Sequence, residues 1–479
     1  MALKRLLSRI VRLLLVMALV GFAPAWIYGG EKAAEPEDES STGLSAGVAR
    51  ITVTPPVGIA MSGFAGRDAA TGIHDDLYAT ALVLVSGDTK AAVVAADLIG
   101  FGDDFTADVR AEVERRTGIP AAAVFLCASH THYGPSTRVY GSDDPAADLD
   151  AYMSNLLHLL SGAVQEAASV VQPVRVGVGR GACDVGINRR EKRPDGVIIL
   201  GNNPDGPMDR EVIVVRLDTV DGEPLAALVN YACHPVCQRH KARGISGDFI
   251  APMRELVEEA TGAKCLYLQG ACGNVNPALM DHSFEPARKS GIRLGEEAVK
   301  AFEGITMSAA VGVATTSAQI DFPALTFGSE EEGRQAVKAI EEKLAQLKKW
   351  KSPEGRIKRE QRRLEQANKA LESIVKGEPL PAVVGEIATL RFSDVALVMT
   401  PGEVFAQIGK QIKEGSPLTD TIFVGYTDGS IGYVPTPDAY PEGGYEVERA
   451  CRVSPDASRM MIQEAQRQLN ELAKDGSGK

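Results

Sequence analysis

The stretch Val124-Phe-Leu-Cys-Ala-Ser-His130-Thr-His132-Tyr-Gly-Pro135 joins an apolar run to a polar end that contains two histidines. Short apolar runs bounded by turn-forming residues are typical of buried strands, so we predict a strand that ends just before His130. In open α/β sheets, ligands bind beyond the carboxyl ends of the strands. The stretch therefore predicts a strand of an α/β sheet and a candidate functional site at its end.

The same kind of apolar run recurs along the chain. The other predicted strands are Ala81–Val85, Ala91–Ala96, Val174–Val178, Val212–Leu217, Ala226–Tyr231, Cys265–Leu268 and Val395–Met399. Helix-length amphipathic stretches lie between several of them, at Asp104–Thr117, Asp148–Val170, Pro252–Thr261 and Glu285–Phe302. Because strands alternate with helices, we predict an α/β fold with a mixed β-sheet core and flanking helices.

Residues 329–377 depart from this pattern. Ser329 followed by Glu332 is a capping-box signature, and apolar residues then recur at helical spacing on both sides of Pro353. We predict a charged helical hairpin that is inserted in the α/β domain. Its basic segment, residues 356–363, is either a binding patch or a solvated helix face.

The composition describes an acidic globular protein. The 479 residues include 51 Lys+Arg and 63 Asp+Glu, which gives a formal net charge of −12. This balance, with only 5% aromatic residues, argues against nucleic acid as a partner. The length suits one large domain or two to three smaller ones, and we place a single domain at residues 47–479.

The N-terminus has the pattern of a secretory signal peptide. Four basic residues precede the apolar run Leu13–Phe22, and Ala23-Pro24-Ala25 offers a small-x-small cleavage site. We therefore expect residues 1–30 to direct export to the periplasm or the extracellular space. The alternative is an uncleaved signal that anchors the chain in a membrane. Residues 31–46 are acidic and serine-rich, which predicts a linker.

The ends of three predicted strands offer metal-binding side chains. His130 and His132 share a face if their segment is extended, and His234 and Glu403 each follow another apolar run. Two imidazoles and a carboxylate are a ligand set that zinc accepts. The structural alternatives are histidines with ordinary hydrogen bonds and a glutamate that favours a helix N-terminus.

Further polar residues follow the strands or lie in glycine-rich loops. Arg189 offers a fixed cation for an anionic group. Asn276 lies in a Gly-Asn-Val-Asn-Pro turn, which suits either ligand binding or a tight polar turn. Tyr433 and Tyr445 lie in glycine-rich loops, where a tyrosine binds metal, donates a proton or packs. Each of these residues taken singly also has a purely structural interpretation.

Taken together and in order, these motifs resemble the catalytic domain of the neutral ceramidases, zinc amidases that cleave the N-acyl bond of ceramide. The resemblance runs from about Gly47 to Glu448. It rests on Gly-Phe-Ala-Gly…Gly-Ile-His74, Ser-His-Thr-His132-x-Gly-Pro, Asn188-Arg189, His234-Pro, Ile245-Ser-Gly-Asp248, Gly-Asn-Val-Asn276-Pro, Pro-Gly-Glu403, Gly-Tyr433-Val-Pro-Thr and Tyr445-Glu.

The resemblance implies a role for each matching position. The residues that match the zinc ligands are His130, His234, Glu403 and Tyr433. The residues that match those around the substrate amide are His132, Arg189 and Tyr445. His132 would then act as general acid or base, while Arg189 and Tyr445 would stabilise the oxyanion. A small-molecule or lipid N-acyl substrate and a transient contact with a membrane surface are the expected partners.

Two features depart from the family pattern. Asn276 stands where the ceramidases carry a serine, and we include it among the candidate catalytic residues. The chain ends at Lys479, so no C-terminal immunoglobulin-like domain is expected. Two alternatives follow: a zinc hydrolase that acts on another acyl amide or ester of the cell envelope, and a non-catalytic binding protein on the same scaffold.

Overall fold

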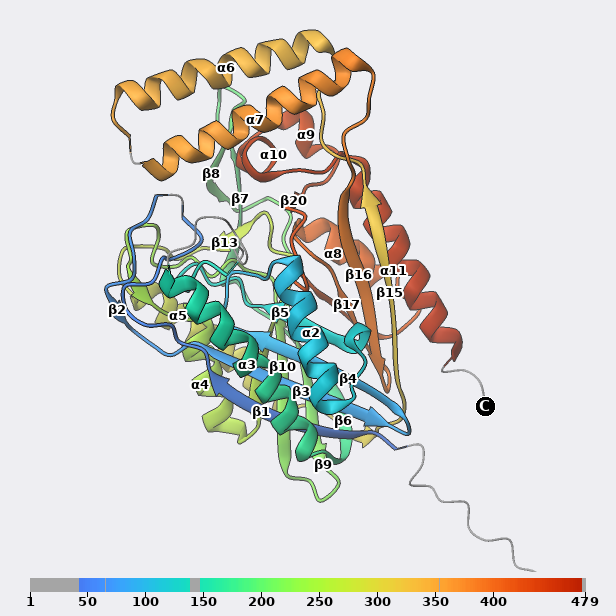
Figure 1. Cartoon of the computed structure of the whole chain (residues 1–479). Coiled ribbons are helices and arrows are strands. Elements are labelled where there is room, and N and C mark those ends of the chain that lie inside the picture. Colours follow the sequence, from blue (N-terminus) through green and yellow to red (C-terminus); the bar gives the residue numbers. More distant parts are fainter. Residues whose placement is uncertain (1–42, 65, 138–146, 353, 476–479) are drawn as a thin grey trace, which may run out of the picture. The chain divides into compact units, whose positions relative to one another are not determined.

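The computed structural model describes residues 43–64, 66–137, 147–352 and 354–475, which form an α/β fold with two large sheets (Figure 1). The predicted signal peptide and residues 31–42 of the predicted linker lie outside these residues. The first strand, β1 (Ser45–Thr52), begins two residues before the predicted boundary at Gly47. It begins there because Leu44 and Ala46 already belong to the buried core.

The larger sheet has nine strands in the order β12-β10-β9-β6-β1-β3-β4-β5, with β14 paired to β6. Its strands after β1 are β3 (Tyr78–Ser86), β4 (Thr89–Ala96), β5 (Val124–Ala128), β6 (Gln172–Ala182), β9 (Glu211–Thr219), β10 (Pro224–Tyr231), β12 (Lys264–Gln269) and β14 (Ser308–Ala309). The β4–β5 and β10–β12 pairs are parallel and the other pairs are antiparallel. The predicted mixed sheet is therefore confirmed.

Helices flank this sheet. They are α2 (Asp103–Thr117), α3 (Ala147–Ser169), α4 (Ile250–Thr261) and α5 (Glu285–Glu303), which match the four helical stretches predicted from the sequence. Alternate residues of a strand point to opposite faces of the sheet. Val214 of β9 thus belongs to the cluster beneath α4 and α5, whereas its neighbour Val215 belongs to the cluster that includes Leu397 of the second sheet.

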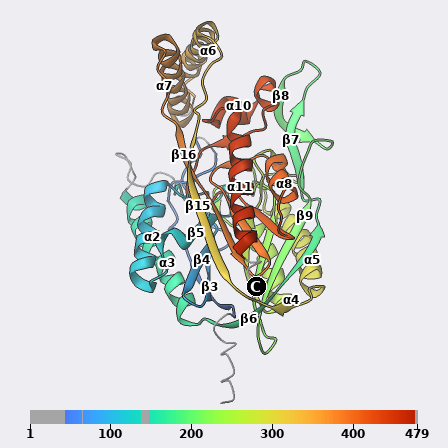
Figure 2. The same ribbon diagram turned by 90° about the vertical axis from the view of Figure 1, so that its right-hand side faces the viewer.

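The second sheet has the order β15-β16-β17-β19. Its strands are β15 (Val313–Phe322), β16 (Val383–Phe392), β17 (Val395–Met399) and β19 (Asp420–Val424). Helices α8 (Ala406–Glu414) and α11 (Asp456–Asp475) pack on it through a third apolar cluster, which includes Ile408 and Leu469 (Figure 2). Apolar side chains thus fill the space on both sides of each sheet.

The predicted hairpin between β15 and β16 is confirmed as helices α6 (Glu330–Lys349) and α7 (Glu354–Lys376). The Ser329 side chain accepts a hydrogen bond from the backbone N–H of Glu332, as the capping box predicts. Ile340 and Leu344 of α6 are buried, while most of its other side chains are polar and exposed. The hairpin therefore buries one narrow apolar stripe.

Short strands pair with one another in the segments that connect the longer strands. The pairs are β2 (Gly72–Ile73) with β11 (Gly244–Ile245), and β18 (Glu403–Val404) with β20 (Tyr433–Val434). A third small sheet contains β13 (Val275–Pro277), β7 (Gly186–Lys192) and β8 (Ile198–Asn203). The short helices α9 (Ala439–Glu442) and α10 (Tyr445–Ala450) follow β20. These segments carry most of the polar residues considered below.

Two further observations concern the described residues. None of their helices is both long and apolar enough to cross a membrane. All seven cysteines are free thiols, and six of them are buried. The buried cysteines therefore pack as small apolar residues.

Candidate metal centre

His130 lies at the carboxyl end of β5 and points its imidazole into the protein. Its backbone has a φ of 66°, and its Nδ1 lies 2.7 Å from the carbonyl oxygen of Ile99. Because a carbonyl oxygen only accepts, Nδ1 carries the proton and Nε2 is left to face the site. The expected extended segment is wrong here: the left-handed turn at His130, not strand alternation, brings His130 and His132 together.

His234 is fixed in the same way. It follows β10, is fully buried, and donates from Nδ1 to the carbonyl oxygens of Cys272 (2.7 Å) and Val275 (3.1 Å). Its Nε2 points to the Glu403 carboxylate, with 3.2 Å between Nε2 and Oε2. Burial and the charge of Arg189 lower the pKa of His234, so the imidazole is neutral and Nε2 offers a lone pair.

Glu403 begins β18 and completes this group of acceptor atoms. Its Oε2 lies 3.4 Å from Nε2 of His130 and 3.2 Å from Nε2 of His234, and the residue is 8% exposed. Although burial opposes ionisation, contact with the two imidazoles holds the pKa of Glu403 well below its usual range. The Glu403 carboxylate and the Nε2 atoms of the two histidines therefore converge on one point.

This convergence is the donor chemistry of a metal site. With each Nδ1 proton directed at a backbone carbonyl, Nε2 of His130 and Nε2 of His234 are acceptors in the neutral imidazole, as are the carboxylate oxygens. Buried acceptors that face one another are costly unless a cation lies between them. Metal-binding histidines almost always direct the other ring N–H at a carbonyl or carboxylate. The residues present therefore fit a divalent cation.

His132 lies beside this group and differs from the other two histidines. Its Nε2 is 3.2 Å from Nε2 of His130, and the three imidazoles have ligand atoms within 4.8 Å of one another. Among the described residues, however, its buried Nδ1 has no hydrogen-bond partner. Burial and the neighbouring imidazoles lower the pKa of His132 well below its usual value. His132 is thus neutral and lacks the backbone anchor that orients the other two.

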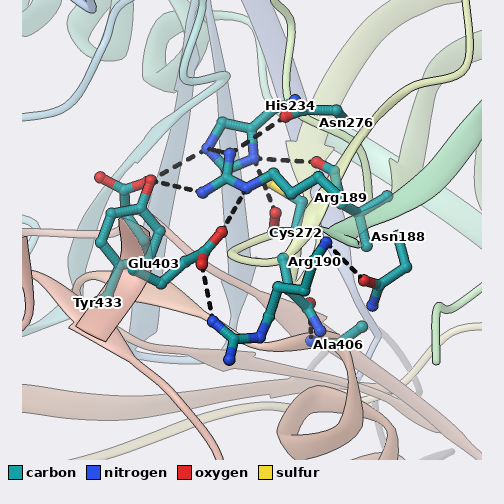
Figure 3. A network of polar contacts seen from close by, with 12 residues as sticks. Asn188, Arg189, Arg190, His234, Cys272, Asn276, Glu403, Ala406 and Tyr433 are labelled. Atoms are coloured by element: carbon teal, nitrogen blue, oxygen red, sulfur yellow. Dashed lines mark hydrogen bonds and ion pairs between the residues drawn. The ribbon is translucent and has the colours of Figure 1, made fainter. Parts of the chain in front are cut away.

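Arg189 of β7 connects the candidate ligands to the surrounding residues (Figure 3). It donates from Nε to Glu446 Oε1 (2.8 Å), from Nη2 to the Tyr433 hydroxyl (2.9 Å) and from Nη1 to Asn276 Oδ1 (3.1 Å). Its side chain is 5% exposed. A buried guanidinium with three such partners is held in one orientation, which suits a fixed positive charge next to the acceptor cluster.

Tyr445 and Asn276 line the same network. Tyr445, the first residue of α10, lies edge-on to Tyr433 with 6.0 Å between ring centroids, and the Arg189 guanidinium lies 5.8 Å from its ring centre. Asn276 in β13 is half-buried and contacts Arg189. Asn274, by contrast, accepts from the backbone N–H of Ala406 and thereby supports the start of α8. The structure thus brings together all eight residues singled out from the sequence.

Three further residues contact the candidate site, although no role was predicted for them from the sequence. They are Glu446, Tyr426 and Gly63. Glu446 is fully buried and pairs with both Arg189 and Arg190. Tyr426 stacks on the His130 imidazole with 4.1 Å between ring centroids. Gly63 packs so closely on His132 that an added Cβ would lie 2.4 Å from its ring. Gly63 and Glu446 lie within the quoted motifs Gly-Phe-Ala-Gly and Tyr445-Glu, which were the available signals.

Comparisons with known proteins show what this chain is similar to. Neutral ceramidase A of Dictyostelium discoideum is 28% identical over 265 residues, which cover 51% of this chain and 36% of the relative's own length. The solved structure of neutral ceramidase from Pseudomonas aeruginosa matches with a TM-score of 0.69 and 18% identity, over 91% of this chain and 75% of that one. A ceramidase complexed with C2 matches with a TM-score of 0.70 and 16% identity, over 91% and 76%.

No family model matches the chain. The two structural matches show that the chain has the fold of the neutral ceramidases. Together with the curated relative, they confirm the family resemblance that the motifs indicate.

Proposed function

We propose that this chain, a relative of the neutral ceramidases in sequence and fold, is a zinc-dependent amidohydrolase that cleaves the N-acyl amide bond of a ceramide-like lipid. One observation carries the proposal. The Nε2 atoms of His130 and His234 meet the Glu403 carboxylate at 3.4 and 3.2 Å, while both Nδ1 atoms are anchored on carbonyl oxygens. The relatives named above supply the substrate class.

In this proposal, His130, His234 and Glu403 hold the metal, and the Tyr433 hydroxyl completes its surroundings. Two imidazoles and one carboxylate are the ligand set of several catalytic zinc sites, which keep a further position open. A zinc ion bound there supplies Lewis acidity toward the substrate carbonyl and toward water.

His132 is the proposed general base. Its imidazole is neutral, so it is able to accept a proton, and its Nε2 lies next to the candidate ligand His130. A base must lie within hydrogen-bond reach of the proton that it removes, and a base next to the metal is placed for a water proton. The same imidazole then returns the proton to the leaving amine.

Arg189 and Tyr445 are the proposed oxyanion donors. The Arg189 guanidinium is held by Glu446, and Asn276 accepts one of its hydrogen bonds. Burial raises the pKa of Tyr445, so the phenol keeps its proton at neutral pH and remains a donor. Fixed donors that need no reorganisation during the reaction are the main source of transition-state stabilisation in such sites. Asn276 acts here by positioning Arg189.

The alternative substrate is another acyl amide or ester. Asn276 favours this alternative, because its amide presents a different hydrogen-bonding group from the serine found at this position in the ceramidases. Hydrolysis rates for ceramide and for short N-acyl amides distinguish the two substrate classes. A non-catalytic binding protein would hold zinc and hydrolyse neither.

The test combines metal analysis with activity. We expect about one zinc per chain in purified protein and loss of both zinc and ceramide hydrolysis in a His130→Ala, His234→Ala double variant. A His282→Ala variant is the control, because His282 is exposed and outside the cluster. Absence of zinc, or full zinc occupancy in the double variant, would overturn the proposal.

We also propose that the chain is exported through its N-terminal 30 residues, with an uncleaved membrane anchor as the alternative. The support is the basic, apolar and small-residue order of residues 4–25. Cell fractionation followed by N-terminal sequencing tests this: a cleaved, exported chain begins near residue 26. Recovery of a soluble cytoplasmic chain that still begins at Met1 would contradict it.

A further inference from the structure

The tip of the α6–α7 hairpin carries a positive net charge, although the net charge of the whole chain is negative. We define the basic tip as residues 348–352 and 354–363. It carries eight basic and two acidic residues, a net charge of +6, whereas the whole chain carries −12. The basic residues are Lys348, Lys349, Lys351, Arg356, Lys358, Arg359, Arg362 and Arg363. A positive patch of this size attracts an anionic partner over about a Debye length.

An exposed tryptophan lies among these charges. Trp350 is 69% exposed, more than any other large apolar side chain of the described residues. It is the C-cap residue that follows α6, and its backbone N–H donates to the carbonyl oxygen of Gln346 at 2.9 Å. Lys351 follows with a φ of 48°, and Lys348 and Lys349 precede it on the last turn. Exposed Trp with neighbouring Lys is the composition of segments that lie in a membrane interface.

A buried carboxylate helps to fix the hairpin to the rest of the fold. Glu360 is 1% exposed and pairs with Lys343 of α6, with Arg363 of α7 and with Arg449 of α10. Lys358 pairs with Glu354. For the other six basic residues of the tip, no ion pair is shown within the described part of the chain. Their charges are therefore available to a partner.

The basic tip adjoins the candidate active site. An added Cβ on Gly355 would lie 2.9 Å from the Cα of Gly66, so the start of α7 contacts the segment that follows Phe64. The ring of Phe64 lies edge-on to His132, with 4.9 Å between ring centroids. Arg359 is also near enough to Tyr445 for its charge to act on the pKa of the phenol. A partner bound at the α7 side of the tip would thus lie beside the candidate metal centre.

We propose that the basic tip docks on an anionic lipid surface, with Trp350 at headgroup level and the neighbouring lysines on the anionic headgroups. Charge complementarity selects this partner, because each basic residue near such a surface adds attraction and the tryptophan adds apolar burial. The proposal goes beyond the hydrolysis proposed above and does not require it. If both hold, docking brings a membrane lipid to the site.

The test is vesicle binding by the full chain. A Trp26→Phe background leaves Trp350 as the single tryptophan, so its fluorescence reports on the tip alone. With phosphatidylcholine vesicles that contain about 30% phosphatidylglycerol, we expect a blue shift of the emission and quenching by brominated lipid. Neither is expected with phosphatidylcholine alone, and high salt should reverse the binding.

Two variants that lose the same charge distinguish the effect of the lysines at the tip from the effect of the net charge on vesicle binding. Replacing Lys348, Lys349 and Lys351 with Gln should weaken vesicle binding on the order of 100-fold, at about fivefold per lysine. The control variant replaces three exposed lysines elsewhere on the hairpin with Gln, and vesicle binding should change little. These lysines are Lys338, Lys369 and Lys376. Absence of vesicle binding, equal loss in both variants, or binding without a change in Trp350 emission would overturn the proposal. Because this readout needs no hydrolysis, it separates failure of docking from failure of the proposed activity.

Discussion

Glu403 and Tyr433 are direct register partners across the parallel strands β18 and β20. The pairing places the phenol beside the carboxylate, and the Tyr433 hydroxyl donates to Glu403 while it accepts from Arg189. Burial raises the pKa of Tyr433 well above its usual value, so the hydroxyl keeps its proton at neutral pH. A pair of two-residue strands thus orients one candidate ligand through the other.

The Tyr433 hydroxyl is therefore expected to support metal binding. In a Tyr433→Phe variant the ring still packs, but Glu403 loses a donor and Arg189 loses an acceptor. Loss of such a partner typically costs about 10- to 100-fold in metal affinity or activity. Zinc affinity measured by competition with a chelator checks this. Tyr440→Phe removes a hydroxyl that bonds Val453 and Ser454 instead and serves as the control. Equal zinc affinity in both variants would contradict the role.

Glu446 is expected to matter for both stability and activity. Its carboxylate, 1% exposed, is shared by Arg189 and Arg190, and removing one partner of a buried ion pair costs about 3–5 kcal/mol. In Glu446→Gln we expect a loss of that order in the free energy of unfolding and a lower kcat/KM, because Arg189 is no longer held. Denaturant titration and kinetics measure the two effects. Glu442→Gln changes a partly exposed partner of Arg190 and should have a small effect. Similar losses in the two variants would count against a special role for Glu446.

Gly63 is expected to set the position of the His132 ring. In Gly63→Ala the added Cβ would lie 2.4 Å from the ring, and the residue has a φ of 92°. Gly58→Ala has a comparable φ of 99° but open space around its Cβ, so it carries the backbone strain alone. We expect both variants to lose about 1–2 kcal/mol of stability. Only Gly63→Ala should also lose kcat, with zinc content unchanged. Equal kcat in both variants would show that His132 tolerates the displacement.

Eight of the strands, and the candidate ligands at three of their ends, were predictable from the sequence, because each is carried by a local pattern. An apolar run ends just before His130, another just before His234 and a third shortly before Glu403. Their convergence had no local signal, because β5 and β10 lie near opposite ends of the larger sheet and β17 belongs to the second sheet. The hairpin helices were predictable for the same reason, since a capping box and a helical stripe are short-range signals.

The contacts that orient these ligands were not predictable in this way. The left-handed backbone at His130 carries no sequence signal, because a positive φ remains uncommon for histidine. Two-residue strands such as β18 and β20 carry no periodicity that a sequence reveals. The pairing of Glu446 with Arg189 joins residues far apart in the chain, and charge alone does not say which carboxylate a buried arginine meets.

The buried carboxyl of Asp248, which is not one of the candidate metal ligands, is expected to make the stability of the protein depend on pH. Its carboxylate is buried at a φ of 59° and accepts hydrogen bonds from the backbone N–H groups of Cys237 (2.9 Å) and Phe249 (2.7 Å). Burial nevertheless raises its pKa from 3.8 to about 7. The folded state therefore binds a proton that the unfolded state has already lost. Its contribution to stability is fully present below about pH 4 and is lost as the pH rises through about 7.

The Asp248→Asn variant isolates this effect, because asparagine has the same shape and tolerates the left-handed region. The free energy of unfolding of the wild type, relative to this variant, should fall by up to about 1.4 kcal/mol per pH unit between the two pKa values. Denaturant titrations at several pH values measure the difference, in which the contributions of other titrating groups cancel. Parallel pH profiles for the two proteins would mean that Asp248 is ionised in the folded state throughout, with its hydrogen bonds outweighing burial.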